Sequence, residues 1–85
     1  GHLVVYPNPA TGIATVQFQL PEPCKVEISI FDLNGSLREV IQTYYTGGDH
    51  QLALPLENYR AGLYFLQLKA PSIREGFITK IAVTR

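Results

Sequence analysis

A strict alternation of apolar and polar residues constrains this chain more than any other feature. Every second residue is apolar from Ala14 to Leu20, and the same pattern runs from Cys24 to Ile30. Side chains on a β-strand point alternately to opposite faces of the sheet, so a period of two predicts half-buried antiparallel strands. The segment between the two stretches, Pro21-Glu22-Pro23, predicts a tight turn that joins them as a hairpin.

Composition and spacing extend this prediction to the whole chain. The 85 residues are 46% hydrophobic and 16% charged, and β-branched, leucine and aromatic residues dominate, which is typical of strands. Five further stretches are expected to be strands: residues 3–6, 37–45, 52–56, 62–69 and 77–85. Seven strands, with turn signals about every 8 to 12 residues, predict an all-β fold. We expect a small antiparallel β-sandwich with immunoglobulin-like Greek-key connections.

The connections carry more specific expectations. Pro7 to Gly12 is expected to be one rigid loop, because each proline fixes its own φ. Asn34-Gly35 is the dipeptide best suited to a turn with positive φ at both central positions. Pro55 cannot donate a ladder hydrogen bond, so its strand should lie at a sheet edge or point this residue outward. Residues 46–49 are expected to form a flexible loop, and residues 70–76 a polar hairpin loop.

The strongest local motif is a glycine two residues ahead of a tyrosine at the start of a strand. Gly62-Leu63-Tyr64 fits a tyrosine corner, in which the ring packs on the core of a β-sandwich and the hydroxyl bonds back to the incoming loop. Residues 56–60 are then the short link that crosses from one sheet to the other. The alternative is that Tyr64 is simply an aromatic residue at the start of a strand.

Charge and cysteine content exclude several classes of protein. Seven Lys and Arg balance seven Asp and Glu, and the basic residues are scattered, so we expect no binding of nucleic acid. The single cysteine, Cys24, permits no internal disulfide, and its place in the alternation indicates a small core residue. The longest apolar runs are four or five residues, far below the roughly 20 that cross a bilayer, so no membrane insertion is expected.

Catalytic and metal chemistry are not expected either. A hydrolase needs a nucleophile beside a base, and the chain offers only His2 and His50 as histidines. Asp32, Asn34 and Gly35 begin like a calcium loop but lack the later acidic ligands, so we interpret them as a turn. We therefore expect no enzyme, no metal and no cofactor.

Two binding functions remain open on this evidence. An exposed set of Tyr44, Tyr45 and Tyr59 would form an aromatic platform for carbohydrate, although strand faces place aromatic residues this way about as often. A sandwich of fibronectin or immunoglobulin type would also serve as an adhesive module or a spacer. A spacer can lie anywhere in a protein, so its position in the parent chain is not restricted.

Four stretches, taken in their order and spacing, resemble the type A C-terminal sorting domain of the type IX (Por) secretion system of Bacteroidetes. They are Val5-Tyr6-Pro7-Asn8-Pro9, Ile30-Phe31-Asp32-Leu33-Asn34-Gly35, Leu56 to Tyr64 with its Gly-x-Tyr, and Lys80-Ile81-Ala82-Val83-Thr84-Arg85. The resemblance covers the chain from Leu3 onward, and the sequence stops directly after the last motif.

The resemblance implies a sorting signal rather than an enzyme. Members of the family end secreted proteins that pass through the periplasm, and the outer-membrane translocon recognises them. A surface sortase usually removes the domain, and the cargo reaches the cell surface or the extracellular space. The positions that match the recognition residues of the family are Gly62, Tyr64, Lys80, Ile81, Val83 and Arg85. The positions that match its structural motifs are Pro7, Asn8, Pro9, Asp32, Asn34 and Gly35.

A terminal strand would suit this role. If it lies at a sheet edge, its unpaired N–H and C=O groups can add to a receptor sheet, while Lys80 and Arg85 set the register. The same edge would allow the domain to associate with itself. Gly1-His2 is expected to be the remnant of a removed tag, with the sorting domain spanning residues 3–85 and the sortase cut upstream of Leu3.

Overall fold

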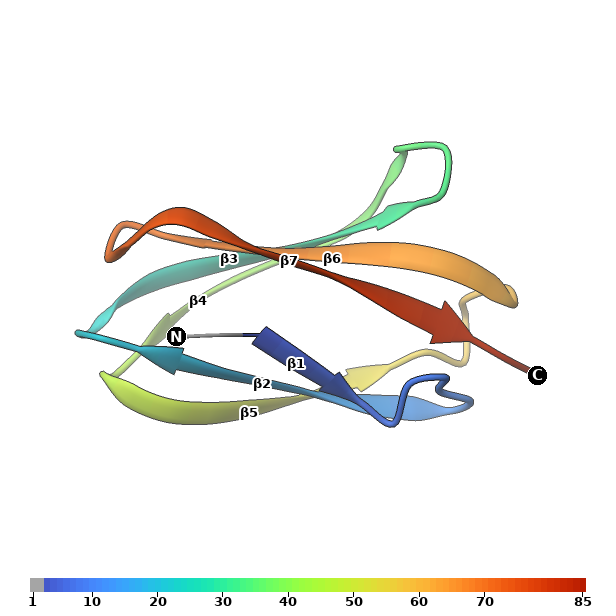
Figure 1. Ribbon diagram of the computed structural model, residues 1–85, viewed down its shortest axis with the longest axis horizontal. Coiled ribbons are helices and arrows are strands. Elements are labelled where there is room, and N and C mark those ends of the chain that lie inside the picture. Colours follow the sequence, from blue (N-terminus) through green and yellow to red (C-terminus); the bar gives the residue numbers. More distant parts are fainter. Residues whose placement is uncertain (1–2) are drawn as a thin grey trace.

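A computed structural model describes residues 3–85 (Figure 1). Within these residues the chain forms seven strands and no helix. The strands are β1 (Leu3–Tyr6), β2 (Ile13–Leu20), β3 (Cys24–Asp32), β4 (Leu37–Tyr45), β5 (Gly48–Pro55), β6 (Gly62–Ala70) and β7 (Ile73–Val83). The expected tag remnant, Gly1-His2, lies outside the described residues.

The strands form two antiparallel sheets that stack as layers in Figure 1. One sheet has the order β1-β2-β5, and the other has the order β4-β3-β6-β7. β4 lies beside β3 in the four-stranded sheet. In a constant-type immunoglobulin domain the corresponding strand belongs to the other sheet. The predicted all-β sandwich with Greek-key connections is therefore confirmed.

The alternation of apolar residues builds the core between the two sheets. Its buried members are Val5, Ala10, Ala14, Val16, Phe18, Leu20, Cys24, Val26, Ile28, Ile30, Leu54, Leu56, Tyr64, Leu66, Leu68, Ile81 and Val83. Each of the larger side chains stabilises the fold by about 1.5 to 3 kcal/mol when it is fully removed from water. The burial of the free Cys24 side chain confirms the prediction that it is a core residue.

The predicted hairpin between β2 and β3 is wrong. β2 pairs with β1 and β5, whereas β3 pairs with β4 and β6. Leu20 and Cys24 are both buried, but from opposite sides of the core. A period of two indicates that one face of each strand is buried, and it does not reveal in which sheet the strand lies. Residues 21–23 thus connect the two layers.

The turn between β3 and β4 also differs from the prediction. Among residues 3–85 positive φ is confined to glycines, so Asn34 does not adopt it, whereas Gly35 has φ of 85°. The turn is closed by the carboxylate of Asp32 instead of by positive φ at two residues. Its Oδ1 accepts hydrogen bonds from the backbone N–H groups of Asn34 and Ser36, both at 3.0 Å. An Asp that bonds the backbone two residues on is a common way of closing a turn.

Two strands begin earlier than predicted. β5 begins at Gly48, inside the expected flexible loop, and pairs with β2 at the edge of its sheet, where Pro55 is exposed as predicted. β7 begins at Ile73, so most of the expected loop of residues 70–76 is strand. A register shift between Leu68 and Ala70 and a φ of 74° at Gly76 let this polar segment continue the ladder.

Candidate recognition end

The four motifs lie far apart in the sequence but meet at one end of the sandwich. Asp32 of β3 is the Cα partner of Tyr64 in β6, and Tyr64 is the partner of Ile81 in β7. Ala10, which directly follows the first motif, bridges to Val83. Figure 1 shows the β3–β4 turn, the chain end, the residue 7–12 loop and the link before β6 together on the right. We call this region the recognition end.

The register of β6 and β7 brings the predicted recognition residues together. Gly62 lies opposite Val83, and Tyr64 lies opposite Ile81. Tyr64, Ile81 and Val83 are 7%, 1% and 3% exposed, so they face the core. These three buried residues therefore shape the end of the sandwich from within, whereas the other three, Gly62, Lys80 and Arg85, are exposed.

The outer edge of the last residues of β7 is covered by Asn8 of the first motif and by Ala10, which follows it. The side-chain amide of Asn8 accepts a hydrogen bond from the N–H of Ala82 and donates one to the carbonyl of Lys80, both at 2.9 Å. The backbone of Ala10 then donates to Ala82 and accepts from Thr84, both at 2.8 Å. An amide side chain carries both a donor and an acceptor, so Asn8 acts here as a strand residue would.

β7 lies at a sheet edge, which was the condition for strand addition, but its terminal part does not have the unpaired backbone groups that strand addition requires. Asn8 and Ala10 already bond the carbonyl of Lys80, both backbone groups of Ala82 and the N–H of Thr84. A receptor strand cannot add there without displacing the first motif. The pattern of β7 alone cannot reveal this cover, because the covering residues are more than 70 positions away.

Replacing Asn8 with alanine is expected to lower the free energy of unfolding by about 1.5 kcal/mol, because two hydrogen bonds to β7 are lost. Chemical denaturation measures this loss, and amide hydrogen exchange at Ala82 should become faster in the variant. The matched control is Asn58→Ala, at an exposed position of the residue 56–60 link, which should change stability by less than about 0.5 kcal/mol. Equal effects of the two changes would contradict the role of Asn8.

Arg85 joins the chain end to two other segments. Its guanidinium donates hydrogen bonds to the carbonyls of Thr11, Leu56 and Tyr59. The planar group carries five N–H donors in a fixed fork, which suits several carbonyls at once. Arg85 therefore holds the residue 7–12 loop and the residue 56–60 link together. It does not stand free to set the register of an added strand.

The predicted tyrosine corner is confirmed. The hydroxyl of Tyr64 donates to the carbonyl of Arg60 at 2.7 Å, and the ring packs edge-on against Tyr59 with centroids 5.2 Å apart. The Tyr59 hydroxyl in turn donates to Glu39 Oε1 at 2.5 Å. Burial, and then this hydrogen bond to the negatively charged Glu39, raise the pKa of the Tyr59 hydroxyl. The phenol therefore stays protonated and links β4 to the recognition end.

Replacing Tyr64 with phenylalanine is expected to lower the free energy of unfolding by about 1 kcal/mol, because the buried hydroxyl loses its hydrogen bond to Arg60. Thermal or urea unfolding measures the change. Tyr44→Phe provides the control, since Tyr44 is 76% exposed and its hydroxyl loss should have no measurable effect. An unchanged melting temperature in Tyr64→Phe would argue against a stabilising corner.

The aromatic platform considered for carbohydrate does not form. Tyr44 is exposed on the outer face of its sheet, whereas Tyr45 turns inward and packs against Phe18 and His50 with centroids 5.1 and 4.8 Å apart. Tyr59 packs against Tyr64. Within residues 3–85 no three His, Cys, Asp or Glu side chains could together hold a metal ion, and no helix could span a membrane.

Sequence reasoning missed two residues of the recognition end. Ala10 is fully buried within an otherwise exposed loop, and Glu39 receives the Tyr59 hydroxyl. A small apolar residue between Pro9 and Thr11 was the available signal for Ala10. The sequence carried no signal for Glu39, because its partner, Tyr59, lies 20 positions away in the residue 56–60 link.

The fold and the convergent motifs define an immunoglobulin-like β-sandwich module whose terminal strand is bonded into one end. Comparison with protein families then identifies the module. The model of the family described as "Secretion system C-terminal sorting domain" matches residues 4–83, nearly the whole chain, so the chain belongs to this family. Such sorting signals of the type IX secretion system are not an enzyme family. No curated protein matches the chain.

Proposed function

We propose that this chain is the address of a secreted cargo, recognised as a folded unit by the outer-membrane translocon of the type IX system. The observation that carries the proposal is the family match over residues 4–83. The convergence of all four motifs at one end supports recognition of a shape rather than of a linear peptide. A surface sortase then removes the domain, and the cargo stays on the cell surface or leaves the cell.

The matched residues take two roles in this proposal. Gly62, Tyr64, Ile81 and Val83 keep the recognition end in shape, which agrees with the burial of the last three. Lys80 is exposed and is available to the translocon. Arg85 and the Pro7-Asn8-Pro9 motif hold the last strand in place, and the Asp32-Asn34-Gly35 turn borders the same end.

The experiment places this chain behind a secreted reporter in a bacterium with a type IX system and measures reporter outside the outer membrane. Deletion of residues 80–85 should leave the reporter in the periplasm, as should deletion of the whole domain. A matched control deletes nothing but carries Glu22→Ala, at an exposed position of the residue 21–23 connection outside the recognition end, and its export should equal that of the unaltered chain. Export that continues without the domain would overturn the proposal. Sequencing the amino terminus of the residual domain tests removal by a sortase.

A spacer or adhesive module of the same fold gives a different outcome. Its fusion to the reporter would not change the reporter's location, whether or not the host has a translocon. The same fusion in a host without the translocon therefore separates the two functions. The sorting proposal requires that the difference between the two hosts disappears when the domain is removed.

A further inference from the structure

The residues that alternate with the buried motif positions of β6 and β7 point away from the core. In β6, Leu63 and Phe65 alternate with the motif positions Gly62 and Tyr64, and Leu63 is 43% exposed. Their cross-strand partners in β7 are Ala82 and Lys80. Residues that are directly opposite on antiparallel strands share one face of the sheet. The buried motif residues Tyr64, Ile81 and Val83 thus alternate with an outward-facing set, which includes the exposed motif residue Lys80.

This outward set continues onto the neighbouring strands. Phe31 in β3 is the Cα partner of Phe65 on one side and of Leu37 in β4 on the other, and Leu37 is 54% exposed. We define the outer apolar face as Phe31, Leu37, Leu63, Phe65 and Ala82. It crosses all four strands of the sheet and borders the recognition end. Contiguous apolar surface of this kind marks interaction sites more often than scattered exposed residues do.

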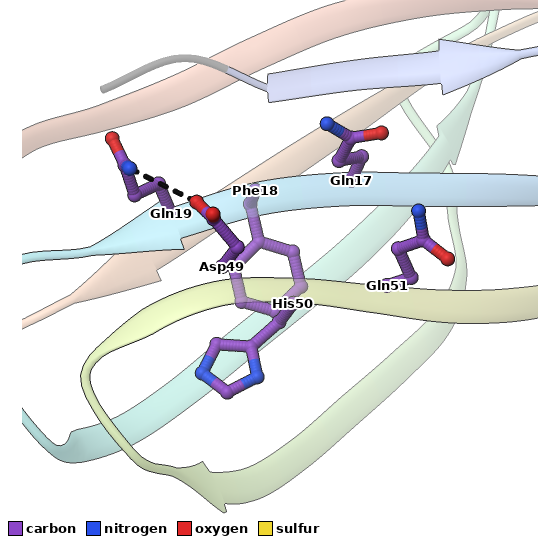
Figure 2. A pocket seen from close by; sticks show the side chains of 6 residues that line it. All are labelled: Gln17, Phe18, Gln19, Asp49, His50 and Gln51. Carbon is purple, nitrogen blue, oxygen red and sulfur yellow. Dashed lines mark hydrogen bonds between the residues drawn. The ribbon is translucent and has the colours of Figure 1, made fainter.

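The middle of the other sheet's outer face is different in character. Figure 2 shows Gln17 and Gln19 of β2 beside Asp49 and Gln51 of β5. Gln19 donates to Asp49 at 2.9 Å, and Gln51 donates to the hydroxyl of Tyr6 at 3.2 Å. This is the ordinary outer face of an antiparallel sheet. The outer apolar face of the four-stranded sheet differs from this polar strip, although the three-stranded sheet also exposes Val4, Tyr6 and Ile13.

Charge indicates what covers the outer apolar face. The cross-strand row Leu37, Phe31, Phe65 ends in Lys80, an exposed cation. A partner that matches this row needs an apolar surface bordered by a carboxylate. A second copy that docked by the same face would bring its own Lys80 and no carboxylate, since the outer apolar face contains no acidic residue. A lipid surface also matches poorly, because the chain has zero net charge and these residues lie on strands rather than on protruding loops.

We propose that the outer apolar face and Lys80 are the surface that a protein of the secretion machinery contacts, through an apolar patch bordered by an acidic side chain. This inference rests on the proposed sorting function and names the contact surface within it. The buried motif residues set the shape of the end, and the outward-facing residues that alternate with them, Lys80 among them, make the contact. Specificity then comes from Lys80, whose charge pairs with the partner, and contact area comes from Leu63, Phe65 and their neighbours.

The test uses the reporter fusion with Lys80→Glu and Leu63→Thr, each compared with a matched control. Arg74→Glu reverses an exposed charge on the same strand away from the face, and Ile13→Thr changes a side chain that is 56% exposed on the other sheet. Both test variants should reduce export about tenfold, since a like charge or a polar group replaces a matched contact. Both controls should export normally. Melting temperatures establish that all four remain folded, and Lys80→Gln provides a milder variant should Lys80→Glu unfold.

Each other outcome overturns this inference. Normal export of folded Lys80→Glu, Lys80→Gln and Leu63→Thr, with export still lost on domain deletion, rejects the contact surface and leaves the sorting function standing. Export that is indifferent to domain deletion rejects the sorting function itself. Light scattering that detects a dimer disrupted by Leu63→Thr assigns the face to a second copy. Co-sedimentation with phosphatidylglycerol vesicles that is lost in Lys80→Glu assigns it to lipid.

Discussion

Replacing Ile81 with alanine is expected to lower the free energy of unfolding by about 3 kcal/mol. Ile81 is 1% exposed and lies opposite Tyr64 in the core of the recognition end. Removing three carbons there leaves a cavity, because residues tied to the first motif and to Arg85 cannot close around it. For a domain of 85 residues the total stability is roughly 4 to 13 kcal/mol, so the loss is a large fraction of the whole.

The matched control for Ile81 lies three positions earlier on the same strand. Ile78 is 64% exposed, so Ile78→Ala should cost less than about 1 kcal/mol. Urea unfolding of both variants measures the difference. Similar losses at the two positions would show that β7 does not bury the face assigned to it here.

Replacing Gly76 with alanine is expected to lower the free energy of unfolding by about 2 kcal/mol. Gly76 has φ of 74°, in the left-handed region that disfavours a side chain. A Cβ at this position would lie 2.7 Å from the carbonyl oxygen of Leu68, which belongs to the backbone of the neighbouring strand. Either the register shift between β6 and β7 or the backbone at Gly76 must then change.

Gly12→Ala is the control for the glycine prediction. A Cβ at Gly12 meets no atom within 4 Å, and Gly12 is absent from the glycines with positive φ. Its replacement should be neutral or slightly stabilising, because alanine restricts the unfolded chain. Thermal unfolding of both variants provides the comparison, and a stable Gly76→Ala variant would contradict the geometry of the β6–β7 bulge.

The local sequence pattern was sufficient to predict features that depend only on a strand's own residues. The buried residues of β2 and β3 follow directly from the period of two, and the tyrosine corner follows from Gly62 and Tyr64. Pro55 predicted that its strand lies at a sheet edge or points this residue outward, since proline removes a ladder donor, and β5 does both. In each case the required chemistry is carried by the residues themselves and by their immediate neighbours.

The sequence pattern failed to predict features that depend on which strands pair with each other. The hairpin predicted between β2 and β3 is wrong because burial of one face is the same in either sheet. The start of β7 was misplaced because Arg74, Glu75 and Gly76 are polar or small, and a ladder with β6 nevertheless accepts them through a bulge. The cover on β7 was missed because it comes from Asn8 and Ala10 at the opposite end of the chain.

The sequence alone established that this chain is a small all-β sandwich, which faces of its strands are buried, and to which family its motifs belong. Only the tertiary structure decided which strands are neighbours and that Asn8 and Ala10 cover the edge of the last strand. It also decided that Tyr64, Ile81 and Val83 face inward, whereas Leu63, Phe65 and Lys80 face outward. The reason is physical. Alternation is a property of consecutive residues, whereas hydrogen bonds such as that from Asn8 to Lys80 join groups 72 positions apart.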